Sequence, residues 1–184
     1  MMQKPLVSVV MITYGHELYI KKAIEGVLMQ KTDFNFELIV ANDNSPDKSD
    51  EIIQKIIASV PSHIVIKYFK NPENLGAIRN LQKAFKEVTA EFVAFCEGDD
   101  YWTDPDKLQL QYEKLSSETN CGLVYTDVDF YDFKTGKKTE SIFGKEGKIR
   151  TSSFEEHLEK KGYLAPPTWM FRKILLDHVG NEDV

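Results

Sequence analysis

Several features that would assign this chain to a common class are missing from its 184 residues. No run approaches the roughly 20 apolar residues of a membrane-spanning helix, so we expect at most peripheral contact with a membrane. The two cysteines, Cys96 and Cys121, have no metal-ligand spacing and lie in apolar runs, which favours buried thiols in a reducing compartment. The start of the chain, with Lys4 and Pro5, does not match a signal peptide. These absences predict a cytoplasmic protein.

Motifs of several large enzyme classes are absent as well. No G-x-G-x-x-G follows the first expected strand, which argues against a dinucleotide-binding oxidoreductase, and no G-x-x-x-x-G-K-S/T of a P-loop NTPase occurs. The G-x-S-x-G of α/β-hydrolases is also missing. The formal net charge of −6 argues against a nucleic-acid partner bound through a basic surface. With 42% hydrophobic residues, the chain is long enough for one domain with a real core, and we expect a single domain over residues 1–184.

The most informative stretch is FVAFCEGDDYW at residues 92–102. It begins as an apolar run, which is typical of a strand buried on both faces, and ends in the carboxylates of Glu97, Asp99 and Asp100. Three acids at a strand end repel one another and resist desolvation, and a divalent ion such as Mg²⁺ or Mn²⁺ prefers such oxygen ligands. The other interpretation is a polar turn in which Asp99 or Asp100 caps the next helix.

Strand-like and helix-like segments alternate along the first half of the chain. We expect strands at residues 6–13, 36–41, 64–69 and 92–96, and helices at 18–30, 45–60 and 77–88. Ser45 and Pro46 look like the start of the second helix, and the third should bury Ile78 and Ala84. Such alternation implies right-handed crossovers and a parallel α/β sheet.

The second half changes character. The patterns predict a helix at 104–115, a strand at 121–131, a hairpin turn at 134–137, a short helix capped by Ser152 or Ser153 and ended by Gly162, an extended segment at 166–172 and a helix at 173–179. We therefore expect a mixed, mainly parallel sheet flanked by helices.

Ligands of parallel sheets collect outside the carboxyl ends of the strands. Three polar clusters follow strands there, at residues 13–17, 42–45 and 97–100. For a nucleotide diphosphate, Tyr14 can offer a flat surface, Asp43 can accept from a base N–H, and Arg79 can contact a phosphate. Each also has a structural interpretation: packing at a strand end for Tyr14, an Asx-turn for Asp43, and a solvated helix position for Arg79.

Taken in order, four stretches resemble the family 2 glycosyltransferases, which build bacterial surface glycans. They are VSVVMITY at 7–14, FELIVANDNS at 36–45, NLGAIRN at 74–80 and EGDDYW at 97–102. The likeness extends from Val7 to about Lys173. It implies an α/β GT-A (nucleotide-diphospho-sugar transferase) fold, a nucleotide-sugar donor, a divalent metal ion and inversion at the anomeric carbon.

The resemblance also implies roles for particular residues. The residues expected around the nucleotide-sugar are Thr13, Tyr14, Glu17, Asp43, Asn74, Gly76, Arg79 and Glu97. Asp99 and Asp100 would coordinate Mn²⁺ or Mg²⁺ or contact the ribose, and Glu97 replaces the first aspartate of the family's D-x-D motif. The catalytic base is expected beyond Val184, in a longer native chain, and Asp183 is the candidate within this sequence.

The expected reaction moves a sugar from a UDP-sugar to a glycan or lipid-linked saccharide acceptor in surface polysaccharide synthesis, at the inner face of the membrane. Two other functions stay open. A sugar-nucleotide nucleotidyltransferase would carry a glycine- and lysine-rich loop after the first strand, and Tyr14–Gly15–His16–Glu17 is not such a loop. A nucleotide-sugar-binding module without catalysis would lack the base, so a longer reading frame with a Glu–Asp motif would favour the enzyme.

Overall fold

The computed structural model describes residues 4–60, 65–141, 153 and 164–179. Asp183 and the short helix expected before Gly162 therefore lie outside the described residues. Among the described residues, no helix is long and apolar enough to cross a membrane.

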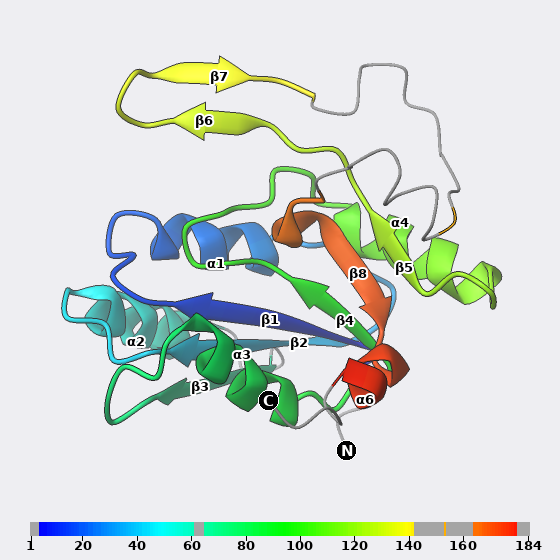
Figure 1. The fold of residues 1–184 in the computed structure, drawn as a ribbon, viewed down its shortest axis with the longest axis horizontal. Helices are drawn as coiled ribbons and strands as arrows, with labels where there is room; N and C mark the ends of the chain where they lie inside the picture. The colour runs from blue at the N-terminus through cyan, green and yellow to red at the C-terminus, as the bar shows by residue number, and fades with distance from the viewer. Residues whose placement is uncertain (1–3, 61–64, 142–152, 154–163, 180–184) are drawn as a thin grey trace.

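A six-stranded sheet forms the centre of the molecule (Figure 1). Its four parallel strands are β1 (Val7–Thr13), β2 (Phe36–Asn42), β3 (Val65–Lys70) and β4 (Phe92–Phe95). The other two are β5 (Leu123–Tyr125) and β8 (Trp169–Arg172). β8 pairs antiparallel with both β4 and β5, which gives the order β3-β2-β1-β4-β8-β5. The predicted mixed, mainly parallel sheet is confirmed.

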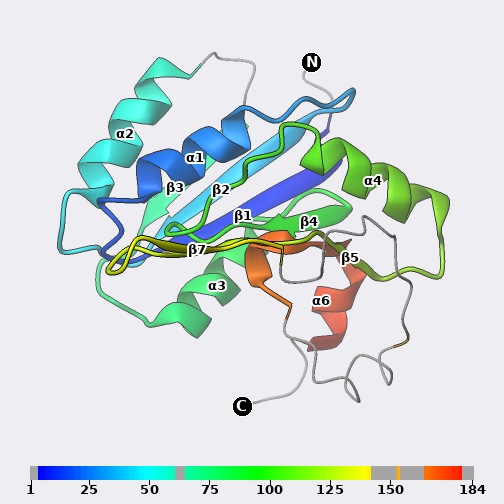
Figure 2. The same ribbon diagram turned by 90° about the horizontal axis from the view of Figure 1, so that it is seen from above.

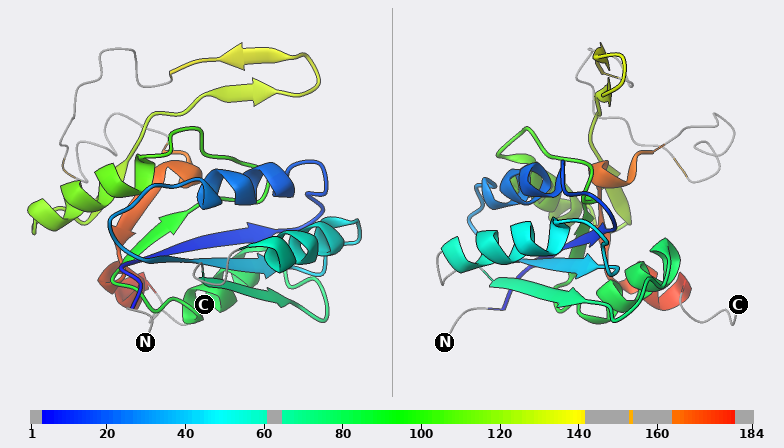
Figure 3. Two further views of the ribbon diagram at one scale, coloured as in Figure 1. Left: turned by 180° about the vertical axis from the view of Figure 1, so that it is seen from behind. Right: turned by 90° about the vertical axis from the view of Figure 1, so that its left-hand side faces the viewer.

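Helices cover both faces of this sheet (Figures 1 and 3). One face carries α1 (Ile20–Leu28), α2 (Ser49–Ser59) and α4 (Lys107–Ser117), and the other carries α3 (Ala77–Lys86) and α6 (Ile174–Val179). A short 3₁₀ helix, η1 (Pro166–Thr168), leads into β8.

The fully buried strand β1 feeds both layers of the core. Val7, Val9 and Met11 belong to the cluster under α1, α2 and α4, whereas Val10 and Ile12 belong to the cluster under α3. This division follows from the alternation of side chains along a strand. It explains why the β1 sequence is apolar almost without interruption.

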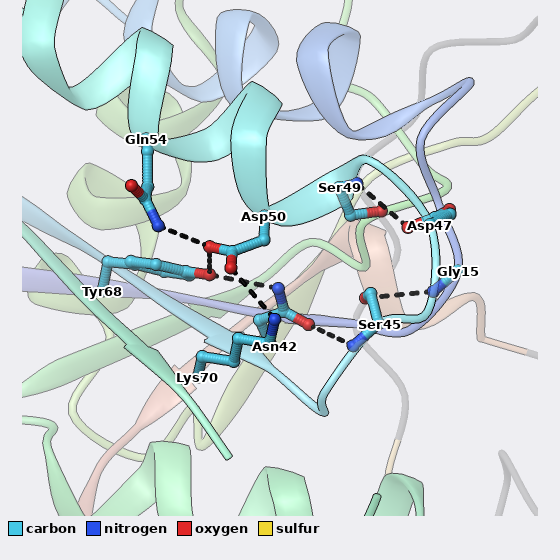
Figure 4. A network of polar contacts seen from close by, with 9 residues as sticks. All are labelled: Gly15, Asn42, Ser45, Asp47, Ser49, Asp50, Gln54, Tyr68 and Lys70. Atoms are coloured by element: carbon cyan, nitrogen blue, oxygen red, sulfur yellow. Dashed lines mark hydrogen bonds and ion pairs between the residues drawn. The ribbon is translucent and has the colours of Figure 1, made fainter. Parts of the chain in front are cut away.

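Two expectations about the helices are wrong. The second helix begins at Ser49 instead of Ser45, because the Ser45 hydroxyl accepts the amide of Gly15 and Asp47 accepts the amide of Ser49 (Figure 4). In α3, Ile78 is 75% exposed, and Asn80 is buried together with Ala84.

The single strand expected at 121–131 is also wrong. β5 ends at Tyr125, and β6 (Phe130–Asp132) belongs to a separate hairpin with β7 (Lys137–Thr139). Between them, Asp127 accepts the hydroxyl and Asp129 the amide of Ser141. The predicted hairpin turn is confirmed, and Gly136 at φ 69° supplies its left-handed residue. The hairpin stands apart from the six-stranded sheet, above α1 in Figure 1.

Candidate functional site

A cavity of about 330 Å³ opens at the carboxyl edge of the parallel strands. Residues from the ends of β1 and β2, from the start of α3 and from the loop after β4 line it: Ile12, Thr13, Tyr14, His16, Asp43, Asn74, Gly76, Ala77, Asn80, Glu97 and Asp99. All three polar clusters predicted at this edge contribute to the cavity. Of the ten residues predicted for the site, seven line it, and Glu17, Arg79 and Asp100 are not among the lining residues.

Asp43, directly after β2, is buried and fully engaged. Its Oδ1 accepts the side-chain amide of Asn71 at 2.8 Å and the backbone amide of Leu75 at 2.9 Å, and its Oδ2 accepts the amide of Gly76 at 2.9 Å. The carboxylate therefore holds the loop before α3 against β2. Gly76 bends that loop at φ 82°, a conformation that glycine adopts without strain. The Asx-turn interpretation of Asp43 is wrong.

Two asparagines continue this wall of the cavity. Asn71 also donates to Oδ1 of Asn80 at 2.9 Å, and Asn80 donates to the carbonyl of Ala41 at 3.0 Å. Sequence reasoning missed Asn80, although it closes the NLGAIRN stretch. Because Asn80 makes these two hydrogen bonds, α3 buries this polar residue, whereas Ile78, which was expected to be buried, is exposed.

Opposite this wall, Thr13 and His16 carry polar atoms without partners. Within the described residues, the buried Thr13 Oγ1 and His16 Nδ1 have no hydrogen-bond partner. Both lie against Gly98, where an added Cβ would sit 2.7 Å from Thr13 Oγ1 and 2.9 Å from His16 Nδ1. Buried polar atoms usually find a partner, so these two are exceptions in the cavity lining, and Gly98 covers both of them. Sequence reasoning missed His16, although it belongs to the polar cluster at 13–17.

The acidic loop, residues 97–102, brings negative charge to the cavity. Burial and the neighbouring Asp100 and Asp99 raise the pKa of Glu97 to about 7. Burial and Asp99 raise the pKa of Asp100 to about 6. Asp99 is exposed, and its Oδ2 lies 3.8 Å from Nε2 of His16. α4 begins after Asp106, so neither Asp99 nor Asp100 caps it, and that interpretation is wrong.

The carboxylates of the acidic loop do not form a complete metal site by themselves among the described residues. In the part of the chain that the structure describes, no group of three or more His, Cys, Asp or Glu is arranged to hold a metal by itself. Glu97 and Asp99 nevertheless both line the cavity, and Mg²⁺ is commonly held by one or two carboxylates together with substrate phosphates. The residues therefore fit an ion that arrives with a diphosphate.

Contacts with other parts of the chain hold the acidic loop in place. Trp102 is buried, and its Nε1 donates to the carbonyl of Pro167 at 2.8 Å. The Lys107 Nζ lies 4.2 Å from the centre of the Trp102 ring, and burial lowers the pKa of Lys107 to about 7. The Cys96 thiol donates to the carbonyls of Glu97 and Asp100, which fixes the backbone of the loop.

The other predicted residues surround the cavity. Glu17 accepts the amide of Lys48, and its own amide donates to Asp47, so it joins the loop after β1 to the start of α2. Arg79 is exposed on α3, two residues after Ala77, which lines the cavity.

The loop after β2 is tied to the sheet by a second network, shown in Figure 4. Asn42 accepts the amide of Ser45 at 2.8 Å and donates to the hydroxyl of Tyr68 at 3.1 Å. The Tyr68 hydroxyl in turn donates to Asp50 at 2.6 Å, and Lys70 pairs with the same carboxylate. The cavity wall is therefore rigidly connected to β3 and α2.

Comparison with known proteins finds similarity to glycosyltransferases. The family model described as glycosyl transferase family 2 matches residues 8–180. The putative glycosyltransferase EpsH of Bacillus subtilis is 32% identical over 140 residues, which cover 76% of this chain and 38% of EpsH. An uncharacterized glycosyltransferase of Methanocaldococcus jannaschii, MJ1057, is 31% identical over 182 residues, covering 96% of this chain and 60% of that protein. The chain thus spans 38% and 60% of the lengths of these two relatives.

Solved structures show the same fold. A crystal structure of S. aureus TarS 1–349 has a TM-score of 0.70 at 23% identity, covering 95% of this chain and 49% of that one. The mannosyltransferase PcManGT from Pyrobaculum calidifontis, in complex with GDP-Man and Mn²⁺, has a TM-score of 0.69 at 19% identity, covering 97% and 47%. At these identities the likeness establishes the fold alone. The predicted GT-A fold is confirmed.

Proposed function

This chain belongs to glycosyltransferase family 2, and we propose that it transfers a sugar from a nucleotide-sugar, with a UDP-sugar as the expected donor, to a glycan or lipid-linked saccharide. The observation that carries the proposal is the cavity at the carboxyl edge of β1, β2 and β4, where Tyr14, Asn74 and the carboxylates of Glu97 and Asp99 line one space. Inversion at the anomeric carbon and a role in surface polysaccharide synthesis, in the cytoplasm at the membrane face, belong to the same proposal.

The cavity wall suggests where the donor lies. Tyr14 offers an exposed ring for the nucleoside, and Thr13 and His16 line the cavity beside it, with their unpartnered atoms buried against Gly98. Asp43 acts mainly by holding the loop of Asn74 and Gly76 in place, because its oxygens already accept three hydrogen bonds. Related folds support a nucleotide donor, since one TarS structure is a complex with UDP-GlcNAc.

We further propose that Asp99 and Asp100, with Glu97 beside them, hold a divalent ion together with the donor diphosphate. The raised pKa values of Glu97 and Asp100 support this role, because such carboxylates lack a compensating cation within the described residues. When bound, Mn²⁺ or Mg²⁺ would offset the charge that develops on the departing diphosphate. PcManGT is a related fold whose complex contains Mn²⁺. The catalytic base stays a prediction, with Asp183 as the candidate.

Calorimetry with UDP tests the donor site and the ion together. We expect the chain to bind UDP at least about tenfold more tightly with Mn²⁺ than with EDTA, an increment of roughly 1.4 kcal/mol. Asp99→Ala should lose this increment, whereas Asp33→Ala, which removes an exposed acid before β2 at the opposite edge of the sheet, should keep it. Equal UDP binding in Mn²⁺ and EDTA would refute the role of the ion, and no UDP binding at all would refute the donor site.

Turnover needs its own measurement. We expect release of free sugar from UDP-sugars, without acceptor, to require the ion and to fall with Asp99→Ala. Tight UDP binding with no release or transfer from any UDP-sugar, also in a longer native chain, would instead support a binding module without catalysis.

A further inference from the structure

An aromatic strip runs from the acidic loop to the β6–β7 hairpin: Tyr101, Lys22, Tyr19, Phe133 and Tyr131. The Lys22 Nζ lies 3.6 Å from the centre of the Tyr101 ring. The Tyr19 and Phe133 ring centres are 4.9 Å apart, and those of Phe133 and Tyr131 are 4.7 Å apart. Tyr19 is the N-cap of α1 and Lys22 follows three residues later, so the two lie on one side of the start of the helix. The aromatic strip therefore consists of two groups of contacts, Lys22 with Tyr101 and Phe133 with Tyr19 and Tyr131, on the same side of α1.

One end of the aromatic strip lies at the proposed donor site. Tyr101 directly follows Asp100, and α1 touches this loop closely, because a Cβ on Gly26 would sit 2.9 Å from backbone atoms of Trp102. The other end lies on the hairpin, whose turn is drawn over the connection between β1 and α1 in both Figures 1 and 2. A ligand on the aromatic strip would thus extend from the acidic loop outward.

The rings are unusually accessible for their size. Tyr101 is 38% exposed, Tyr131 48% and Phe133 60%. Half-exposed aromatic rings suit a partner that has an apolar face and hydrogen-bonding groups, since tyrosine offers a ring and a hydroxyl together. A pyranose ring has this character, with C–H groups on its faces and hydroxyls on its rim.

The charge of the hairpin argues against an anionic bilayer as the partner. Residues 129–140 contain three lysines and three acids, so their net charge is zero. Lys138 is already paired with Asp129 at 3.0 Å and with Glu140 at 3.2 Å. A surface that recognises anionic lipids would carry an excess of basic residues.

We propose that the aromatic strip binds the saccharide acceptor and leads its hydroxyl toward the acidic loop. This inference rests on the proposed sugar transfer and assigns the acceptor side of the same site. The partner is an uncharged oligosaccharide segment that packs against the exposed parts of the Tyr101, Phe133 and Tyr131 rings.

The test uses Phe133→Ala and Tyr131→Ala, with Phe130→Ala as the matched control. Residues 131 and 133 share one face of the hairpin, as their ring contact confirms, and residue 130 points to the other face. The probe is an array of immobilised oligosaccharides from bacterial surface glycans. We expect the unmodified chain to bind at least one of them, and each test variant to bind it about five- to tenfold more weakly, as expected for one lost aromatic contact. Phe130→Ala should bind as the unmodified chain does.

UDP binding, measured on the same proteins, separates this inference from the proposed function. The acceptor role is supported if the unmodified chain binds UDP, and Phe133→Ala binds UDP within twofold of it but binds the saccharide more weakly. The acceptor role alone is overturned if the unmodified chain binds UDP but no saccharide, or if all variants bind the saccharide as tightly as the unmodified chain does. If the unmodified chain binds neither UDP nor any saccharide, the proposed function is overturned. Sedimentation with phosphatidylglycerol and phosphatidylethanolamine vesicles that depends on Phe133, without saccharide binding, would assign the aromatic strip to a membrane and overturn the inference.

Discussion

Asp43 follows β2 and the acidic loop follows β4, so two acidic segments flank the end of β1 at one edge of the sheet. Asp43 receives three hydrogen bonds from the loop before α3. In the acidic loop, burial and mutual repulsion raise the pKa values of Glu97 and Asp100 instead. The fold uses the charge of Asp43 for its own assembly, whereas it leaves the acidic loop to be compensated by something bound.

This difference has a physical origin. The groups around Asp43 are amide donors from the loop at 71–76, which can turn toward the carboxylate when that loop closes. The charged residues of the acidic loop are all acids, and the buried Lys107 donates to Gln111 and lies over Trp102. A buried carboxylate without such partners is costly, so it persists where a ligand completes it.

The largest effect on stability is expected at Asp43. Asp43→Asn leaves one acceptor oxygen and sets an NH₂ group against backbone N–H donors, so we expect the free energy of unfolding to fall by about 3 kcal/mol. Urea denaturation followed by circular dichroism measures the change. Asp99→Asn is the matched control in the acidic loop, and it should lose no more than about 0.5 kcal/mol. Equal losses in the two variants would mean that both segments support the fold.

The next largest effect is a pH dependence from the acidic loop. Folding raises the pKa of Glu97 from 4.5 to about 7 and that of Asp100 from 3.8 to about 6. Between about pH 4 and 7 these two groups hold more protons in the folded chain than in the unfolded chain, so their contribution to the free energy of unfolding falls as the pH rises and is complete near pH 7. Above pH 7 the lowered pKa of Lys107 contributes the opposite slope. Because Glu97 and Asp100 are partly open to solvent, we expect a combined fall of about 2 kcal/mol from them.

Urea titrations in EDTA at several pH values measure this fall. Glu37 and Asp50 have pKa values that folding lowers, so they contribute the opposite slope at lower pH. Subtracting the pH profile of the double variant Glu97→Gln, Asp100→Asn from that of the unmodified chain cancels the contribution of Glu37 and Asp50. The remaining slope is that of Glu97 and Asp100. If the two proteins show the same pH profile, the acidic loop is already compensated within the chain.

The contrast between the two segments was only partly visible in the sequence. The alternation of apolar strands and helices predicted the sheet and brought the three polar clusters to one edge, because that placement follows from chain direction alone. The partners of Asp43 are 28 to 33 residues away, so no local pattern could show that its oxygens are occupied. The same holds for Ser45, which looks like a helix cap but accepts the amide of Gly15.

The acidic loop was predicted better, because its chemistry lies in consecutive residues. Its contacts with other segments could not be predicted: His16 faces Asp99, and Gly98 packs on Thr13. The break between β5 and β6 was missed because residues 121–131 keep a strand-like composition through it.

A smaller effect should show how tightly the acidic loop packs on β1. In Gly98→Ala the new methyl group would lie 2.7 Å from Thr13 Oγ1 and 2.9 Å from His16 Nδ1, so one of these segments has to move. We expect a loss of about 1–2 kcal/mol in urea denaturation, and weaker UDP binding. Gly122→Ala is the control, because its methyl group would meet only the flexible end of Leu175, at 3.3 Å. Unchanged UDP affinity in Gly98→Ala would place the nucleotide away from Thr13 and His16.

The smallest effect on stability is expected at Arg79, which is exposed on α3 close to Ala77 of the cavity wall. Arg79→Gln should change the free energy of unfolding by less than about 0.5 kcal/mol, since no partner of its side chain within the described residues is lost. If the guanidinium contacts the donor phosphates, UDP affinity should nevertheless fall about fivefold or more, with a smaller loss for uridine, which has no phosphate. Equal losses for UDP and uridine would exclude a phosphate contact. Arg79 would then make no contact with the diphosphate, and the ion at the acidic loop would have to compensate the negative charge of the diphosphate.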